Sequence, residues 1–197
     1  RYYRALPRKV IILAGEPDSG KTAFLLNFMR MNMKERRINY FSSEMGEAEL
    51  RDRISNFDSP LSEWPDTFFE RSSNFADVVR PDDINIIDFL EITKDFYLVA
   101  EHVKAIHERL RGGVALIAIQ KNRGVELGLG GGRSMEKARL YLSMEHGRIT
   151  IVKCKNWADS GVNPNRLQRE FQLVKGCKFI EKSPWRPASD REMCAAA

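Results

Sequence analysis

The sequence predicts an α/β protein with a mostly parallel central sheet, helices on both faces of that sheet, and antiparallel strands at its C-terminal end. Apolar, strand-like runs alternate with helical segments over the first two thirds of the chain, and a glycine-containing segment joins the first run to the first helix. Later runs are shorter and separated by turns, which is typical of antiparallel pairs. The expected parallel strands are residues 10–14, 38–42, 84–90 and 114–119, with helices at 45–54 and 96–110.

Composition places the chain among ordinary globular domains. Its 197 residues suit one domain with a sizeable core, and 43% hydrophobic against 30% charged residues leaves no apolar run near the ~20 residues of a membrane span. We therefore expect no membrane partner. Three scattered cysteines (Cys154, Cys177 and Cys194) without C-x-x-C spacing indicate a reducing compartment, the cytoplasm. A net charge of +5 permits a nucleic-acid partner without requiring one.

Residues 15–22 read Gly-Glu-Pro-Asp-Ser-Gly-Lys-Thr, a complete G-x-x-x-x-G-K-[ST] phosphate-binding loop. The loop lies between a strand-like run and a helix, which is the context that the motif needs. Backbone N–H groups can surround phosphate oxygens there, and the helix N-terminus adds a positive dipole. Lys21 is expected to reach the β- and γ-phosphates, and the Thr22 hydroxyl to bind Mg²⁺. The predicted ATP·Mg²⁺ site comprises Gly15, Glu16, Pro17, Asp18, Ser19, Gly20, Lys21, Thr22 and Ala23.

Polar residues near the ends of the next strands supply the other parts of a triphosphate-hydrolysing site. Asp88 lies near the end of the third run, where open α/β sheets bind ligands, and we expect it to hold Mg²⁺ through water. Glu44 follows the second run and is expected to polarise the attacking water, with Glu91 as the alternative base. Gln120, after the fourth run, suits a sensor of the γ-phosphate.

A basic, glycine-rich segment follows Gln120. Residues 121–133 have no core pattern, so we expect a mobile loop. Lys121, Arg123 and Arg133 are the candidate contacts to single-stranded DNA, because cations neutralise phosphates regardless of sequence. The loop lacks aromatic side chains for base stacking, and a solvated loop without DNA contact is the alternative.

The remaining chain is expected to form antiparallel strands and a tail. Turn residues separate the apolar runs of this part, as in hairpins. We expect the ATPase domain to span residues 1–182 and a loosely ordered tail to span 183–197. The expected late strands are residues 140–144, 148–153, 170–174 and 178–181.

These motifs, in order, carry a resemblance to a family. The phosphate loop followed by Tyr-Phe-Ser-Ser-Glu-Met at 40–45 resembles the RecA-like ATPase core of DnaB-type replicative helicases, where a similar FSxEM segment carries the catalytic glutamate. Residues 86–90 look like the family's Walker B strand, and residues 117–120 are similar to its sensor strand. The resemblance, from about residue 10 to 156, implies a RecA-like fold and catalytic roles for Lys21, Glu44 and Gln120. It also implies ATP·Mg²⁺ hydrolysis at interfaces of a homo-oligomer, such as a hexameric ring, with single-stranded DNA in its centre.

One departure concerns the residues that would act on a neighbouring subunit's nucleotide. Where the family ends its trans-acting motif in arginine, this chain has Lys153 and Lys155. A lysine cannot make the two-pronged contact of a guanidinium. Both lysines could instead be solvated residues of an edge strand.

The sequence thus favours a DNA-dependent ATPase of the helicase type. The lysines at 153 and 155 leave room for a second reading, a nucleotide-gated oligomerisation or partner-binding module with slow turnover. A small-molecule kinase is a weaker alternative, because residues 121–133 offer little to enclose a second substrate.

Overall fold

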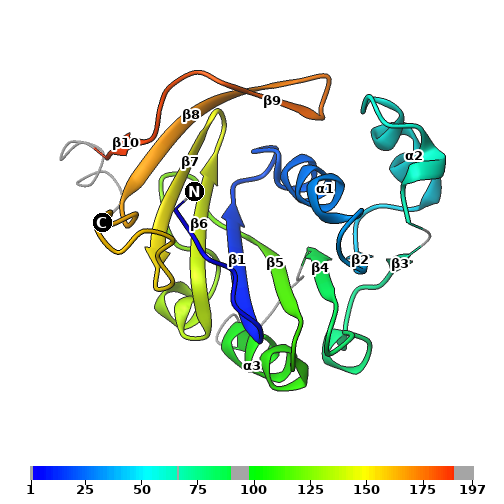
Figure 1. Cartoon of the computed structure of the whole chain (residues 1–197), viewed down its shortest axis with the longest axis horizontal. Helices are drawn as coiled ribbons and strands as arrows, with labels where there is room; N and C mark the ends of the chain where they lie inside the picture. Colours follow the sequence, from blue (N-terminus) through cyan, green and yellow to red (C-terminus); the bar gives the residue numbers. More distant parts are fainter. Residues whose placement is uncertain (1, 66, 90–97, 189–197) are drawn as a thin grey trace.

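The chain folds around one sheet with a helix on each face (Figure 1). This computed structural model describes residues 2–65, 67–89 and 98–188. Strands follow the order β10-β8-β7-β6-β1-β5-β4-β2-β3, and β9 pairs with β8. Their bounds are β1 Lys9–Gly15, β2 Ile38–Ser42, β3 Phe68–Glu70, β4 Ile84–Asp88, β5 Val114–Gln120, β6 Ala138–Glu145, β7 Arg148–Cys154, β8 Leu167–Val174, β9 Lys178–Glu181 and β10 Arg186–Pro187. The helices are α1 Lys21–Asn32, α2 Glu47–Ser55 and α3 Val99–Arg109, with 3₁₀ turns η1 Leu61–Glu63, η2 Phe75–Asp77 and η4 Gly131–Met135.

The strands from β6 to β3 in this order are parallel, and β6, β7, β8, β9 and β10 are joined by antiparallel pairings. Strand β1 lies between β5 and β6, so that Gly15 is level with Gln120 on one side and with Met144 on the other. The carboxyl ends of these three strands therefore meet at one edge of the sheet. The phosphate loop begins at this edge.

Alternating side chains of β1 pack in two separate hydrophobic layers. Ile11 and Leu13 belong to the cluster that contains Leu25, Leu26 and Met29 of α1. Val10, Ile12 and Ala14 belong to the cluster that contains Val103 and Ile106 of α3. Continuous apolar strands of this kind need cover on both faces. The predicted class, a mostly parallel sheet with helices on both faces and late antiparallel strands, is confirmed.

The structure differs from the sequence expectations at three places. Helix α2 begins at Glu47 and not at residue 45, because Met45 is buried and its amide is bonded to the Ser42 hydroxyl. The segment 121–133 is folded against the sheet, as described below. Order continues past residue 182, since Arg186 and Pro187 pair with β8 and the Trp185 ring packs edge-on against Tyr2.

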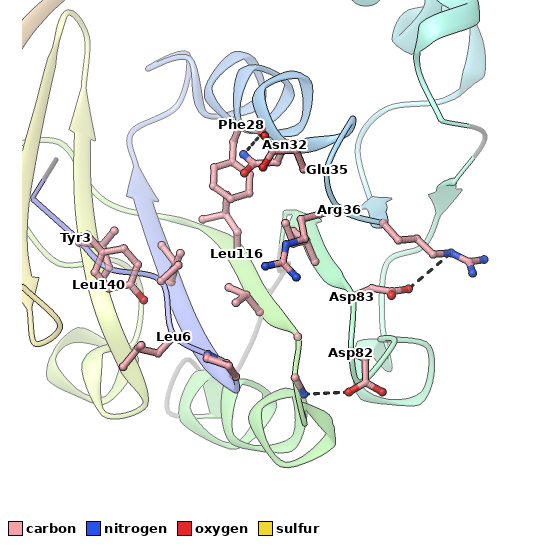
Figure 2. A pocket seen from close by; sticks show the side chains of 18 of the residues that line it. Tyr3, Leu6, Phe28, Asn32, Glu35, Arg36, Asp82, Asp83, Leu116 and Leu140 are labelled. Carbon is pink, nitrogen blue, oxygen red and sulfur yellow. Dashed lines mark hydrogen bonds and ion pairs between the residues drawn. The ribbon is translucent and has the colours of Figure 1, made fainter. Parts of the chain in front are cut away.

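A cavity of about 420 Å³ lies at the other edge of the sheet, near the amino ends of β1 and β5 (Figure 2). Apolar side chains such as Leu116 and Leu140 line it, together with charged residues that include Arg36 and Asp83. The lining includes no residue of the phosphate loop. We therefore do not assign this cavity to the nucleotide site.

Gly113 fixes the entry into β5, and replacing it should destabilise the fold. A Cβ atom at this position would lie 2.2 Å from the Asp83 carbonyl oxygen and 2.9 Å from that of Pro81. Both contacts are with main chain, so Gly113→Ala should lower the free energy of unfolding by about 3 kcal/mol. Urea denaturation monitored by circular dichroism would measure this change in the free energy of unfolding. Gly132→Ala, where a Cβ meets nothing within 4 Å, is the control; equal midpoints for the two variants would contradict the prediction.

Candidate functional site

The phosphate loop leaves β1 at Gly15 and enters α1 at Lys21. Gly20, directly before the helix, has φ +95°, in the left-handed region where a side chain is strained. This conformation turns the chain so that the helix N-terminus faces the loop. The backbone is thereby arranged as an anion-binding site.

Lys21 lies folded back on the main chain of the loop. Its Nζ donates to the carbonyl oxygens of Glu16 at 2.9 Å and Gly15 at 3.3 Å. Burial lowers the pKa of Lys21, while the nearby carboxylates of Glu44, Asp88 and Asp18 oppose that shift. The ammonium is thus surrounded by acceptors, and an anion that entered the loop would compete with the two carbonyls for it.

Two further features of the loop fit a phosphate chain. A Cβ at Gly15 would lie 2.5 Å from Lys21 Cγ and 2.8 Å from Ser19 Oγ, so only glycine leaves room for the lysine stem. Among the described residues, the buried Ser19 hydroxyl has no hydrogen-bond partner. A phosphate oxygen could supply the missing partner.

Asp88 ends β4 beside the start of α1. It is 3% exposed, accepts a hydrogen bond from the Tyr40 hydroxyl at 2.6 Å, and is bonded to the Thr22 hydroxyl. Burial raises the pKa of Asp88, and the bonds from Tyr40 and Thr22 and the charge of Lys21 oppose that rise. The predicted metal-binding pair, Thr22 and Asp88, is therefore brought together.

The donor set suits Mg²⁺, which is commonly held by one or two carboxylates, water and substrate phosphates. Over residues 2–65, 67–89 and 98–188, no group of three His, Cys, Asp or Glu side chains could hold a metal by itself. Thr22 and Asp88 would consequently hold Mg²⁺ together with the phosphates of a bound nucleotide.

Glu44 lies between β2 and α2, on the exposed side of the same edge. Its carboxylate is close enough to Lys21 to raise the pKa of that lysine. The Ser43 amide donates to the Asp88 carbonyl at 3.0 Å, which ties the Glu44 segment to the end of β4. The alternative base, Glu91, lies outside the described residues.

Gln120 ends β5 directly beside Gly15, with which it is paired in register. The next amide, of Lys121, donates to the Gly15 carbonyl at 3.0 Å. The Gln120 carbonyl in turn accepts from Leu129 at 2.8 Å. The expected sensor thus stands between the phosphate loop and the following segment.

Comparison with known proteins agrees with this geometry. A family model described as the DnaB-like helicase C terminal domain matches residues 5–63. A solved KaiC-like protein from the hyperthermophilic archaeon Pyrococcus horikoshii OT3 superimposes with a TM-score of 0.67 at 13% sequence identity, with 90% of each chain covered. The chain therefore has a RecA-like fold, as the KaiC-like protein does, and its residues 5–63 are similar to the DnaB-like helicase domain. A search of curated proteins found no match.

In this RecA-like core, Lys121 does not lie where a DNA contact would need it. Its side chain is 0% exposed, and its Nζ is 3.0 Å from Glu145 Oε1 and 2.9 Å from the Val125 carbonyl oxygen. The sequence reading of Lys121 as a surface cation is thereby corrected, because carboxylate partners distant in sequence draw the ammonium inward. Arg123 and Arg133 are exposed, as a DNA contact requires.

The segment that carries these arginines is held to the sheet. The Gly128 amide donates to the Tyr141 hydroxyl at 2.8 Å, which also bonds to Ser134 at 2.9 Å. Residues 131–135 form η4. The expected open loop is therefore largely a folded connection, and Arg123 is located in its exposed part.

Lys153 and Lys155 lie toward the opposite edge of the RecA-like core from its own phosphate loop. Lys153 is level with Tyr141, whereas Met144 is level with Gly15. The Lys153 ammonium donates to the Met135 carbonyl, and burial, followed by the charges of Lys155 and Arg139, lowers its pKa. Lys155 is exposed. Neither lysine is therefore level with the phosphate loop of the same chain.

Sequence reasoning missed two parts of the site. Tyr40 lies in β2, which also contains Asn39 and Ser42, so the sequence did not single out its hydroxyl as the partner of Asp88. The strands of the β8–β9 hairpin were expected, but their place beside the phosphate loop was not: Leu173 and Phe179 lie next to Gly20, and Phe179 packs edge-on against Phe24 of α1. The phosphate loop is thus supported by chain from the far end of the sequence.

Of the helices in the part of the chain that the structure describes, none is both long and apolar enough to cross a membrane.

Proposed function

We propose that this chain is a DNA-dependent ATPase, a helicase-type motor of DNA replication or repair that acts as an oligomer on single-stranded DNA. One observation carries the proposal: Lys21, Thr22, Asp88 and Gln120 meet at the carboxyl edge of the sheet, with Glu44 beside them. Phosphate-binding, metal-binding, water-activating and sensing groups are the parts that ATP hydrolysis needs.

The roles follow from these positions. Lys21 exchanges its two carbonyl partners for phosphate oxygens, and Thr22 and Asp88 would hold Mg²⁺, which would offset the phosphate charge. Glu44 accepts a proton from the attacking water. Gln120, whose carbonyl accepts from the Leu129 amide and whose neighbour Lys121 donates to Gly15, reports the loss of the γ-phosphate.

Partners are proposed from the exposed cations. Arg123 and Arg133 are the remaining candidates for DNA phosphates. Lys155 is exposed, whereas the Lys153 ammonium already donates to the Met135 carbonyl. Lys155 is therefore the better candidate to contact the nucleotide of a neighbouring subunit, which favours a head-to-tail oligomer such as a hexameric ring. Because Cys154 and Cys177 are free thiols, we place the protein in the cytoplasm.

A second function, the nucleotide-gated module with slow turnover, is favoured by one observation. The Lys153 ammonium already has an acceptor in the Met135 carbonyl. If it keeps that partner in an oligomer, the neighbouring nucleotide receives less positive charge, and hydrolysis is slow.

Steady-state ATP hydrolysis against single-stranded DNA concentration separates the two functions, and Glu44→Gln tests the base. We expect DNA to stimulate the wild type, with the effect fading at moderate salt. Glu44→Gln should lower kcat by about 10²–10⁴-fold, the usual contribution of a general base. The control is Glu47→Gln, an exposed carboxylate of α2 paired with Arg51 at 2.7 Å. Slow turnover that ignores DNA would favour the gated module, and full activity in Glu44→Gln would move the base to Glu91.

A further inference from the structure

A buried lysine, Lys121, lies behind the phosphate loop. Its ammonium is 3.0 Å from Glu145 Oε1 and 3.8 Å from Glu16 Oε1, and donates to the Val125 carbonyl at 2.9 Å. An ammonium that is 0% exposed needs such partners, because burying an unpaired charge is costly. Lys121 is thereby fixed in one place.

The partners of Lys121 belong to three different segments. Glu16 is part of the phosphate loop, Glu145 ends β6 and is also paired with Arg148, and Val125 lies in the connection that bears Arg123. The Glu16 carboxylate accepts a second bond from the Gly124 amide at 3.2 Å. The phosphate loop and the Arg123 segment are thus joined through both an ion pair and a main-chain amide.

A shared acceptor connects this cluster to the catalytic lysine. The Gly15 carbonyl accepts from Lys21 Nζ at 3.3 Å and from the Lys121 amide at 3.0 Å. The Glu16 carbonyl also accepts from Lys21 Nζ. When Lys21 turns to a phosphate, both carbonyls lose one donor, and the Gly15 carbonyl keeps the Lys121 amide as its remaining partner. The Glu16 amide stays bonded to the Met144 carbonyl, so the change at the two carbonyls reaches Lys121 through a main chain that is still held.

We propose that Lys121 is a positioning residue that holds Gln120 in place and transmits occupancy of the phosphate loop to the Arg123 segment. The inference rests on the proposed function, since it names how the ATP site acts on the segment expected to contact DNA. Lys121 touches neither nucleotide nor DNA; it acts through Glu16, Glu145 and the main chain on either side of it.

Two variants test the proposal. Lys121→Met removes the charge and keeps most of the side-chain length. Glu145→Gln keeps the size of its side chain and provides a variant that leaves the ammonium in place if Lys121→Met does not fold. Lys104→Met, on the exposed face of α3, is the matched control. Each protein is checked by circular dichroism before assay.

Two readouts separate positioning from a merely structural role. The first is the split between kcat and KM for ATP. The second is the rate at which trypsin cleaves after Arg123, with and without a non-hydrolysable ATP analogue. In the wild type the analogue should change that rate; in Lys121→Met and Glu145→Gln the change should vanish. Their kcat should fall about tenfold or more, as for a displaced catalytic group, while KM moves less than about threefold.

The outcomes distinguish a failure of this inference from a failure of the proposed ATPase function. If wild-type protein hydrolyses ATP and folded Glu145→Gln matches it in kcat and in the response of Arg123, the coupling role is overturned and the ATPase proposal stands. If the wild type binds neither ATP nor the analogue, both are overturned. Loss of the response in the two variants, with Lys104→Met unchanged, supports the inference.

Discussion

Replacing Lys21 by alanine should lower kcat/KM for ATP by at least about 10²–10³-fold, as removal of one strong donor to a developing anion does. Lys21 is the ammonium that the loop already holds among the Gly15 and Glu16 carbonyls, and alanine supplies no donor in its place. The fold should persist, because the lysine bonds only to those two carbonyls among the hydrogen bonds described. Nucleotide binding and steady-state hydrolysis would measure the effect.

The control for Lys21→Ala is Lys34→Ala, which removes an exposed lysine paired with Glu63 at 3.2 Å. It should leave both binding and hydrolysis unchanged. Retention of more than about a tenth of wild-type kcat/KM in Lys21→Ala would contradict the assignment of the phosphate site.

Gly15→Ala should greatly weaken nucleotide binding while the sheet still forms. A Cβ at this position would lie 2.5 Å from Lys21 Cγ and 2.7 Å from Lys21 Cδ, so the stem of the lysine must leave its place. The new methyl would also lie 2.8 Å from Ser19 Oγ. We expect a loss of ATP affinity of about 10²-fold or more, as when a catalytic group is displaced by 1 Å. Fluorescent-nucleotide titration would measure the affinity.

Gly46→Ala is the matched control for Gly15→Ala. A Cβ there meets nothing within 4 Å, and φ at Gly46 is −83°, which any residue adopts. Gly46 lies before α2 and outside the phosphate loop, so this variant should bind nucleotide as the wild type does. Equal nucleotide affinities for Gly15→Ala and Gly46→Ala would show that binding does not require the space that Gly15 leaves for the Lys21 side chain.

Much of the fold could be predicted from the sequence, because continuous apolar strands are buried only in a sheet that is covered on both faces. The phosphate loop could be predicted because the spacing of its glycines and lysine specifies a local turn. Asp88, Glu44 and Gln120 could be predicted because the carboxyl ends of parallel strands meet at one edge of the sheet. These predictions rest on local patterns and on the parallel arrangement. Short segments of sequence are enough to indicate both the local patterns and the parallel arrangement.

The burial of Lys121 could not be predicted from local sequence patterns. A lysine that follows a strand and precedes a glycine-rich segment has the local pattern of a solvated cation. Its burial depends on Glu16 and Glu145, which no local pattern connects to it. The β8–β9 contact over Gly20 was missed for the same reason, since Leu173 and Phe179 reach the loop only through the complete sheet.

The position of β1 in the middle of the sheet has a consequence for how the protein is made. β1 is synthesised before the other strands of this sheet, yet its neighbours are β5 and β6, and β6 ends only at Glu145. A nascent chain that has reached residue 120 contains every residue of the phosphate loop but lacks one of the two strands that seat it. Pairings of such long sequence separation form slowly. We therefore expect a growing chain of that length to expose apolar strands and to need protection from aggregation until β6 has paired with β1.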